Sequence, residues 1–389
     1  MIKLAKSNFF REKETKRELA KFIKRAKKLS MDREVARFER SFAKWQGRRF
    51  AVMVNSGSSA NLLLIQALLN LGRLKKGDTI GVSVLTWSTN VMPILSLGLR
   101  PVAIDCEIET LSVSPKTLAT HVPRLKVLFL TNVLGLADDI DAIRKMCAKN
   151  KVILLEDNCE ALGSETSGRL LGNFGLAATF SFYVGHHLST IEGGMVVTND
   201  RGLYLALLLA RAHGWDRNLP PAKQRRLRRQ YRVDDFFSLY TFYDIGYNLR
   251  PTEIQGFLGS ITLPFLRTMI RAREWNFKFL AKTMRGNHDF LPLKTKHMKV
   301  FSNFAVPLVC RNRGVFERYR ARFKKANVEI RPIIAGAITK HPFYRKYVRR
   351  PEKCPNAEFI HQNAFYFPNN SELTMSELRL LKRLVSGGF

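Results

Sequence analysis

The stretch ILLEDNCEALGSETSGRLLGNFGLAATFSFYVGHHLSTIEGGMVVTN, residues 153–199, decides the fold and carries most of the functional signal. It begins with an apolar run that ends in two carboxylates, Glu156 and Asp157, and it later reaches the histidine pair His186 and His187. An open α/β sheet binds its ligands beyond the carboxyl ends of buried strands. We therefore expect Asp157 either to cap the next helix or to pair with a buried cation.

Strand-like and helix-like segments alternate on both sides of this stretch. Alternation of this kind predicts β-α-β units and a mostly parallel sheet that is buried on both faces, so the fold class is α/β. The expected strands are residues 51–55, 79–84, 101–105, 127–130, 152–156, 178–183 and 194–198.

The chain has 389 residues, which is enough for two domains. We expect an N-terminal helical segment over residues 1–50 and a large domain over 51–270. Residues 271–389 are predicted to form a linker helix and a smaller C-terminal α/β domain. Within the small domain we expect a strand over FSNFAVPLV (301–309) and another at 328–331.

The composition is that of a soluble globular protein, with 46% hydrophobic and 25% charged residues. The longest apolar runs are too short or too interrupted to span a bilayer, and the N-terminus has no signal-peptide core. The five cysteines are scattered, without metal-ligand spacing, which favours reduced thiols. These features predict a cytoplasmic protein.

The net charge is +33, from 65 Lys and Arg against 32 Asp and Glu. A charge of this size can mark a binder of nucleic acid or of an anionic surface. The denser runs, at residues 3–28, 223–232 and 311–350, lack the aromatic pattern of RNA-binding segments. We expect a solvated basic surface and no nucleic-acid partner.

The segment SGSSAN, residues 56–61, lies where a predicted strand gives way to a helix. Exposed N–H groups at such a junction attract anions, and Gly57 allows a ligand to approach the backbone closely. The serines could instead act only as helix caps, so this segment alone leaves both interpretations open.

Several motifs in this order and spacing resemble one family: NSGSSAN (55–61), GDTI (77–80), LEDNCEALGS (155–164), FSFY (180–183), EGGMVVTND (192–200), RAHGW (211–215) and GYNLRPTEIQ (246–255). They resemble the DegT/DnrJ/EryC1/StrS family, vitamin B6-dependent sugar aminotransferases of fold type I. The resemblance covers roughly residues 29–385. It implies a PLP-dependent transferase fold, with residues 51–270 as the cofactor-binding domain, and a homodimer with shared active sites.

The resemblance also implies roles for individual residues of the cofactor site. The groups that would hold the cofactor phosphate are Gly57, Ser58, Ser181 and, from the other subunit, Asn248. The groups that would contact the pyridine ring are Trp87 by stacking, Asp157 at the ring nitrogen and Glu160 near the ring hydroxyl.

The chain departs from the family at the residue that defines its usual chemistry. The aminotransferases carry a lysine after FSFY that binds the cofactor covalently, whereas His186 stands here and no lysine lies between Lys151 and Lys223. Imidazole cannot form a Schiff base, but with a pKa of about 6.5 it can move protons. One subgroup of the family, the nucleotide-sugar 3-dehydratases, makes the same replacement, and SFYVGHH is similar to it.

The resemblance to this subgroup implies a reaction. Pyridoxamine 5′-phosphate (PMP), held non-covalently, would serve the removal of the C3 hydroxyl from a nucleotide-linked 4-keto-6-deoxyhexose, with His186 as the catalytic base. The product would be a 4-keto-3,6-dideoxy sugar, and L-glutamate would regenerate PMP from pyridoxal 5′-phosphate (PLP).

No metal is expected in this site. A related branch of the subgroup holds a [2Fe–2S] cluster on four cysteines after the histidine pair, but here no cysteine follows Cys159 until Cys310, so no iron–sulfur cluster is expected. Neighbouring histidines usually point apart, and no pattern of carboxylates completes a ligand set around them.

Three further residues are candidates for substrate binding: His213, Arg250 and Arg331. The two arginines would suit sugar or diphosphate oxygens, with surface salt bridges as the alternative. His213 could equally be structural. Two other functions remain open for the whole chain: an aminotransferase that works without the lysine, and a silent family member that binds anionic partners through its basic surface.

Overall fold

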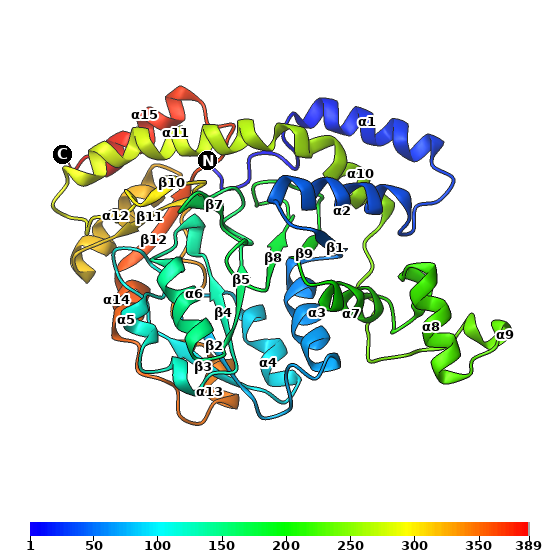
Figure 1. Ribbon diagram of the computed structural model, residues 1–389. Coiled ribbons are helices and arrows are strands. Elements are labelled where there is room, and N and C mark those ends of the chain that lie inside the picture. The colour runs from blue at the N-terminus through cyan, green and yellow to red at the C-terminus, as the bar shows by residue number, and fades with distance from the viewer. Residues whose placement is uncertain (388–389) are drawn as a thin grey trace.

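The computed structural model describes residues 1–387 and contains a central seven-stranded sheet with helices on both faces (Figure 1). β9 runs antiparallel to both of its neighbours, and the remaining adjacent pairs are parallel. The predicted α/β class is confirmed. In spatial order the strands are β1 (Phe50–Val54), β9 (Gly194–Thr198), β8 (Ala177–Ser181), β5 (Ile153–Asp157), β4 (Val127–Thr131), β2 (Thr79–Ser83) and β3 (Arg100–Ile104).

The two faces of the sheet bury different side chains of β8, because successive residues of a strand point to opposite faces. Ala178 and Phe180 pack with Phe38 and Phe42 of α2 (Arg33–Gln46). The opposite face of β8 carries Thr179 and Ser181 and lies against α3 (Gly57–Asn70). The hydroxyl-rich side of TFSFY therefore faces the start of α3.

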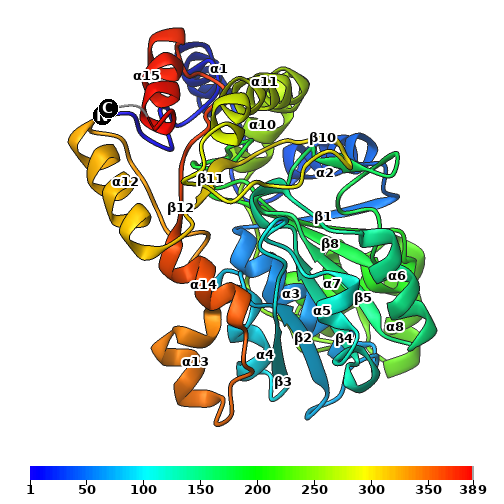
Figure 2. The ribbon, with the colours of Figure 1, turned by 90° about the vertical axis from the view of Figure 1, so that its left-hand side faces the viewer.

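Other helices complete the layers around the sheet, and Figures 1 and 2 show them from two sides. They include α4 (Met92–Ser96), α5 (Pro115–Leu118), α6 (Ile140–Lys149) and α7 (Arg201–Arg211). The N-terminal helices α1 (Glu12–Arg25) and α2 pack on α10 (Glu253–Thr262). At that contact the buried Glu253 carboxylate accepts N–H groups from Asp32, Glu34 and Val35 at the start of α2.

The C-terminal part begins with the long helix α11 (Leu266–Arg285). It contains a two-stranded antiparallel sheet of β11 (Ala305–Val309) and β12 (Ala364–Pro368), with the helices α12 (Arg313–Lys325), α13 (Pro342–Tyr347), α14 (Pro355–Asn363) and α15 (Met375–Val385). The short strands β6 (Glu165–Thr166), β7 (Arg169–Leu170) and β10 (Met298–Val300) form a third sheet. The division of the chain at residues 50 and 270 stays a prediction.

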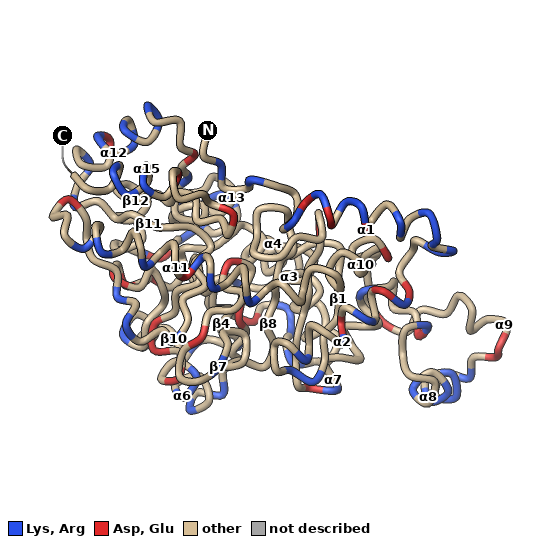
Figure 3. The backbone as a smooth tube through the Cα atoms, turned by 90° about the horizontal axis from the view of Figure 1, so that it is seen from above, with Lys and Arg blue, Asp and Glu red and all other residues tan. Residues whose placement is uncertain are grey.

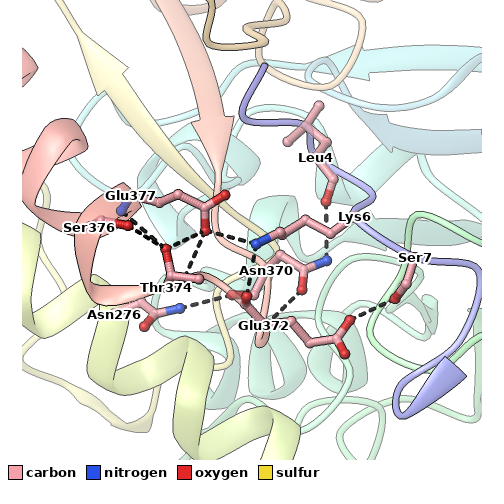
Figure 4. Close-up of polar contacts among 9 residues, drawn as sticks. All are labelled: Leu4, Lys6, Ser7, Asn276, Asn370, Glu372, Thr374, Ser376 and Glu377. Atoms are coloured by element: carbon pink, nitrogen blue, oxygen red, sulfur yellow. Dashed lines mark hydrogen bonds and ion pairs between the residues drawn. The ribbon is translucent and has the colours of Figure 1, made fainter. Parts of the chain in front are cut away.

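The strand predicted at residues 328–331 is wrong. Val328 and Arg331 each form only an isolated bridge, to Ile2 and to Tyr366. The partner of Val328 is the N-terminal segment, which lies along the C-terminal part. Figure 4 shows how Lys6 and Ser7 hold this segment in place through Glu372 and residues near it.

Helix α8 (Pro221–Tyr231) and the short α9 (Asp235–Ser238) project from the body of the molecule (Figure 1). No residue of α8 is buried, and its lysines and arginines form one of the basic segments visible in Figure 3. The basic run at 223–232 is therefore a solvated helix in this structure. None of the helices within residues 1–387 is both long and apolar enough to cross a membrane.

Glu156 fixes the turn that leads into β8. Its side chain is fully buried and accepts N–H groups from Gly172 at 2.7 Å, Phe174 at 2.7 Å and Gly175 at 2.8 Å. A carboxylate supplies acceptors only, so it satisfies three donors that would otherwise be buried without partners.

We expect Glu156→Gln to destabilise the fold by about 2 kcal/mol, because the amide NH₂ would oppose backbone donors in a buried site. Urea unfolding followed by circular dichroism measures this loss. Glu165→Gln is the control, since its ion pair with Lys299 is largely exposed on the lysine side and should change stability by less than about 0.5 kcal/mol. Equal stability of the two variants would contradict the role of Glu156.

Candidate active site

Asp157 lies at the carboxyl end of β5 and is 4% exposed. Its Oδ2 atom accepts the side-chain amides of Asn90 at 2.7 Å and Asn61 at 3.2 Å, and its Oδ1 atom accepts the Cys159 N–H at 2.9 Å. The partners of Asp157 in the described chain are thus two side-chain amides, the backbone N–H of Cys159 and the Cys159 thiol, not a cation. Neither of the two asparagines was singled out from the sequence, although Asn61 belongs to the SGSSAN segment.

A small cradle lies at the start of α3, next to the end of β8. Ser56 caps the helix by accepting the Ser59 N–H at 3.1 Å, so the cap interpretation is correct for Ser56, and Gly57 and Ser58 follow it at the first turn. A Cβ atom on Gly57 would lie 2.6 Å from Ser181 Cβ and 3.2 Å from Cys159 Sγ. The structure therefore packs the Gly57 backbone directly against the Ser181 and Cys159 side chains, an approach that only glycine allows.

His186 lies in the loop that follows β8 and is half-buried. Its Nδ1 atom is 3.4 Å from Ser181 O, and its ring meets the Phe304 ring edge-on with centroids 5.3 Å apart. Burial lowers the pKa of His186 to about 4, although the charge of Asp157 acts in the opposite direction. The imidazole is therefore neutral at pH 7, and with Nδ1 facing a carbonyl oxygen the lone pair belongs to Nε2.

His187 has a different environment from that of its neighbour. It is 3% exposed, and its Nε2 atom contacts Ser302 O at 3.0 Å. Burial lowers its pKa well below the usual value. In this structure His187 makes a packing contact with the segment before β11.

Glu160 and Trp87 lie on the two loops nearest to Asp157. Glu160 accepts the Leu134 N–H at 3.2 Å, and burial raises its pKa to about 8. Trp87 directly precedes the short helix that carries Asn90, and its side chain is 55% exposed. Trp87 is therefore an exposed tryptophan close in sequence to Asn90, a hydrogen-bond partner of Asp157. Its indole offers a flat apolar surface on which an aromatic ring could stack.

His213, Asn248 and Arg250 form a second cluster. Asn248 pairs with Ala212 through a backbone bridge and accepts Arg250 Nε at 3.0 Å on its side chain. The rings of His213 and Trp215 lie 4.8 Å apart, and the Arg250 guanidinium lies 6.0 Å from the Trp215 ring. Asn248 and Arg250 are exposed.

Arg331 forms an ion pair with Glu329 and also lies beside Tyr366. Its Nη2 atom pairs with Glu329 Oε1 at 2.6 Å, on a side chain that is 56% exposed. The salt-bridge alternative therefore describes Arg331 in this structure, and its contact with a substrate stays a prediction. Within residues 1–387 no group of three His, Cys, Asp or Glu side chains is arranged to hold a metal ion.

The profile of the DegT/DnrJ/EryC1/StrS aminotransferase family matches residues 11–384. The chain belongs to this family. It is 34% identical to the GDP-4-keto-6-deoxy-D-mannose 3-dehydratase of Escherichia coli O55:H7, over 92% of this chain and 94% of that protein. The enzyme of the same description from Yersinia pseudotuberculosis is 33% identical over 90% of this chain and 89% of its own length.

Solved structures agree with these sequence relatives. A crystal structure of GDP-4-keto-6-deoxymannose-3-dehydratase with a trapped PLP-glutamate geminal diamine superposes with a TM-score of 0.90. It is 32% identical to this chain, and the match covers 99% of this chain and 100% of that one. The resemblance to the DegT/DnrJ/EryC1/StrS family is confirmed.

The residues of the site fit the B6 cofactor of this family. The cradle at Gly57 suits a phosphate, because α3 starts there and a helix N-terminus attracts anions. Asp157 is held rigidly by Asn61 and Asn90 and would face the ring nitrogen, which it would keep protonated. Trp87 would supply the stacking surface.

Gly57→Ala should weaken binding of PMP by at least about tenfold, because the added methyl group would collide with Ser181 and displace it from the start of α3. Quenching of protein fluorescence during a PMP titration measures this affinity. Gly314→Ala, near the start of α12, is the control, since a Cβ there meets only Asn312 Oδ1 at 3.4 Å. Unchanged PMP affinity in Gly57→Ala would rule out the cradle as the phosphate site.

We expect His186 to lower the stability of the unliganded protein as the pH falls from about 6.5 to 4, whereas Glu160, whose pKa is raised to about 8, acts in the opposite direction. In this range the unfolded chain protonates His186, whose usual pKa is 6.5, whereas the folded chain resists protonation until pH is about 4. The loss attributable to His186 should be about 3 kcal/mol at pH 4, measured by urea unfolding across the pH range.

His186→Asn should remove this part of the pH dependence. The exposed His288 provides the control, and His288→Asn should retain the acid sensitivity of the wild type. Identical pH dependence in His186→Asn and the wild type would show that the imidazole of His186 is not buried in its neutral form.

Proposed function

We propose that this protein is a nucleotide-sugar 3-dehydratase of deoxysugar biosynthesis. It removes the C3 hydroxyl of a nucleotide-linked 4-keto-6-deoxyhexose and produces a 4-keto-3,6-dideoxy sugar and ammonia. The observation that carries the proposal is His186, which stands where the family's aminotransferases carry their lysine and which the fold keeps neutral. The two 3-dehydratases that are 33–34% identical over nearly the full chain support it.

When bound, PMP supplies an amine for the C4 ketone and a ring that withdraws electrons. Without a lysine in the loop after β8, the cofactor is held non-covalently, by the cradle at Gly57 and Ser181, by Asp157 and by Trp87. Ser58 adds a donor at the first turn of α3, and Glu160 lies near the ring hydroxyl.

His186 moves the protons of the reaction. Its Nε2 lone pair would accept a proton from the C4′ carbon of the cofactor. The resulting imidazolium would return that proton to the C3 hydroxyl, which would leave as water. A neutral imidazole is needed for the first of these steps, and burial provides it. L-Glutamate then restores the amine, in keeping with the glutamate adduct described for the solved relative.

The nucleotide proposed for the substrate is GDP, since both of the relatives above act on a GDP-linked sugar. His213, Arg250 and Arg331 are proposed to contact the sugar or the diphosphate. No iron–sulfur cluster is proposed, because the five free cysteines include four buried side chains and only Cys159 lies beside the site. Free thiols also suit the reducing cytoplasm.

A homodimer with shared active sites is proposed as the working form, with Asn248 of each chain serving the cofactor phosphate of the other. Two observations support it. Asn248 and Arg250 are exposed, and the neighbouring segment carries large exposed apolar side chains such as Phe236, Phe237 and Tyr240. A monomer rarely leaves such a group uncovered.

The test is incubation of the purified protein with PMP, L-glutamate and GDP-4-keto-6-deoxymannose, followed by mass spectrometry of the sugar nucleotide. A dehydratase yields a product that has lost the C3 oxygen and releases ammonia. An aminotransferase instead gives an amino sugar with its C3 hydroxyl, and a silent family member gives no change. CDP- and dTDP-linked substrates in parallel identify the nucleotide.

His186→Asn should lower the dehydration rate at least about a hundredfold, because the base is lost, while it still binds PMP. His288→Asn, on the exposed surface, should retain full activity and serves as the control. Dehydration at the wild-type rate by His186→Asn would overturn the assignment of the base.

A further inference from the structure

Arg273 is a buried cation without a carboxylate partner among residues 1–387. It lies on α11, is 3% exposed, and donates from Nη1 to two backbone carbonyls, Phe304 O at 2.8 Å and Asn369 O. Its Nε atom is buried without an acceptor. Burial of an unpaired charge normally costs several kcal/mol, so a guanidinium placed on two carbonyls calls for a specific role.

The two carbonyls belong to segments that are far apart in the sequence. Phe304 precedes β11, and Asn369 follows β12. Asn369 closes the arrangement, because its side-chain amide donates back to Arg273 O at 3.1 Å and to Asn303 O at 2.9 Å. One turn further along α11, Asn276 donates to the next carbonyl, Asn370 O, at 3.0 Å (Figure 4). Helix α11 therefore holds the end of the small sheet at which β11 begins and β12 ends.

The segment that Arg273 holds forms a wall against the histidine pair. The Phe304 ring stands perpendicular to the His186 ring, at 89° and 5.3 Å, and lies 6.2 Å from the His187 ring. The same segment supplies Ser302 O to His187. The segment is also linked to Glu160 through Leu134. The Asn303 side-chain amide donates to Leu134 O, and the Leu134 N–H donates to the Glu160 carboxylate.

A small open pocket lies beside the histidine pair. Its lining includes the histidine pair, Arg273, residues 7–10 of the N-terminal segment and residues 370–372. Two hydrogen bonds fix the backbone at Phe304: Arg273 donates to the Phe304 carbonyl at 2.8 Å, and the Phe304 N–H donates to Leu134 O at 3.2 Å.

We propose that Arg273 is a positioning residue for His186, which holds the Phe304 wall against the imidazole and so fixes the ring toward the cofactor site. The inference rests on the proposed role of His186 as the base. Charge supports the geometry: Arg273 on α11 favours neutral His186, as burial does, whereas Asp157 on β5 opposes it. His187 lies next in the chain and is itself kept neutral by burial and by Arg273.

The first test titrates the histidines of the unliganded protein by NMR in the wild type, Arg273→Met and Arg273→Lys. The pKa of His186 should rise by about one pH unit in Arg273→Met, which loses the charge and the wall contacts. Arg211→Met is the control, because Arg211 is also buried but pairs with Glu39 on another helix, and it should leave the titration of His186 unchanged. An unchanged titration of His186 in a folded Arg273→Met protein overturns the proposal.

The second test measures dehydration by Arg273→Lys, which keeps the charge but has a shorter side chain, so its ammonium nitrogen cannot take the position of the Nη1 atom that donates to both carbonyls. Its kcat should fall about tenfold with little change in the KM for the sugar nucleotide, whereas a purely structural residue would lower the melting temperature and leave kcat per folded protein unchanged. If Arg273→Met does not fold, the kcat of Arg273→Lys decides the question. A wild-type kcat in Arg273→Lys would then overturn the proposal. Because the NMR test needs no substrate, failure of the proposed reaction would leave the positioning of His186 separately measurable.

Discussion

Two adjacent carboxylates at the end of β5 organise the rest of the structure. Because successive side chains of a strand point to opposite faces, Glu156 and Asp157 work on different sides of the sheet. Glu156 binds the backbone of residues 172–175 and so fixes the entry into β8, the strand that ends at Ser181. Asp157 binds Asn61 and Asn90 and so ties α3 and the loop after β2 to the same point.

The position of His186 depends on this arrangement. The turn held by Glu156 sets the start of β8, and β8 delivers the loop of His186 beside the end of β5. The loop then meets the C-terminal part of the chain at Phe304, where Arg273 fastens the backbone. An imidazole cannot form the Schiff base that a lysine in this loop would form, but in its neutral form it can accept a proton.

Charge acts at two different scales in this molecule. Around the histidine pair, burial and a single guanidinium keep both imidazoles neutral. At the surface the excess of lysine and arginine is spread over exposed helices such as α8, where solvent screens it. The +33 charge therefore has no part in the geometry of the site, and nothing in the structure explains its size.

The sequence by itself determined the alternating α/β sheet, the family and the exchange of lysine for His186, because each depends on a local pattern or on one position. It also placed Gly57 and Ser181 in one site through the family resemblance. Only the tertiary structure separated the roles of Glu156 and Asp157, paired Arg331 with Glu329, and replaced the strand expected at 328–331 by isolated bridges. It alone revealed Arg273, whose partners lie 31 and 96 positions away. Such contacts follow from the packing of distant segments, and no local pattern of residue types encodes them.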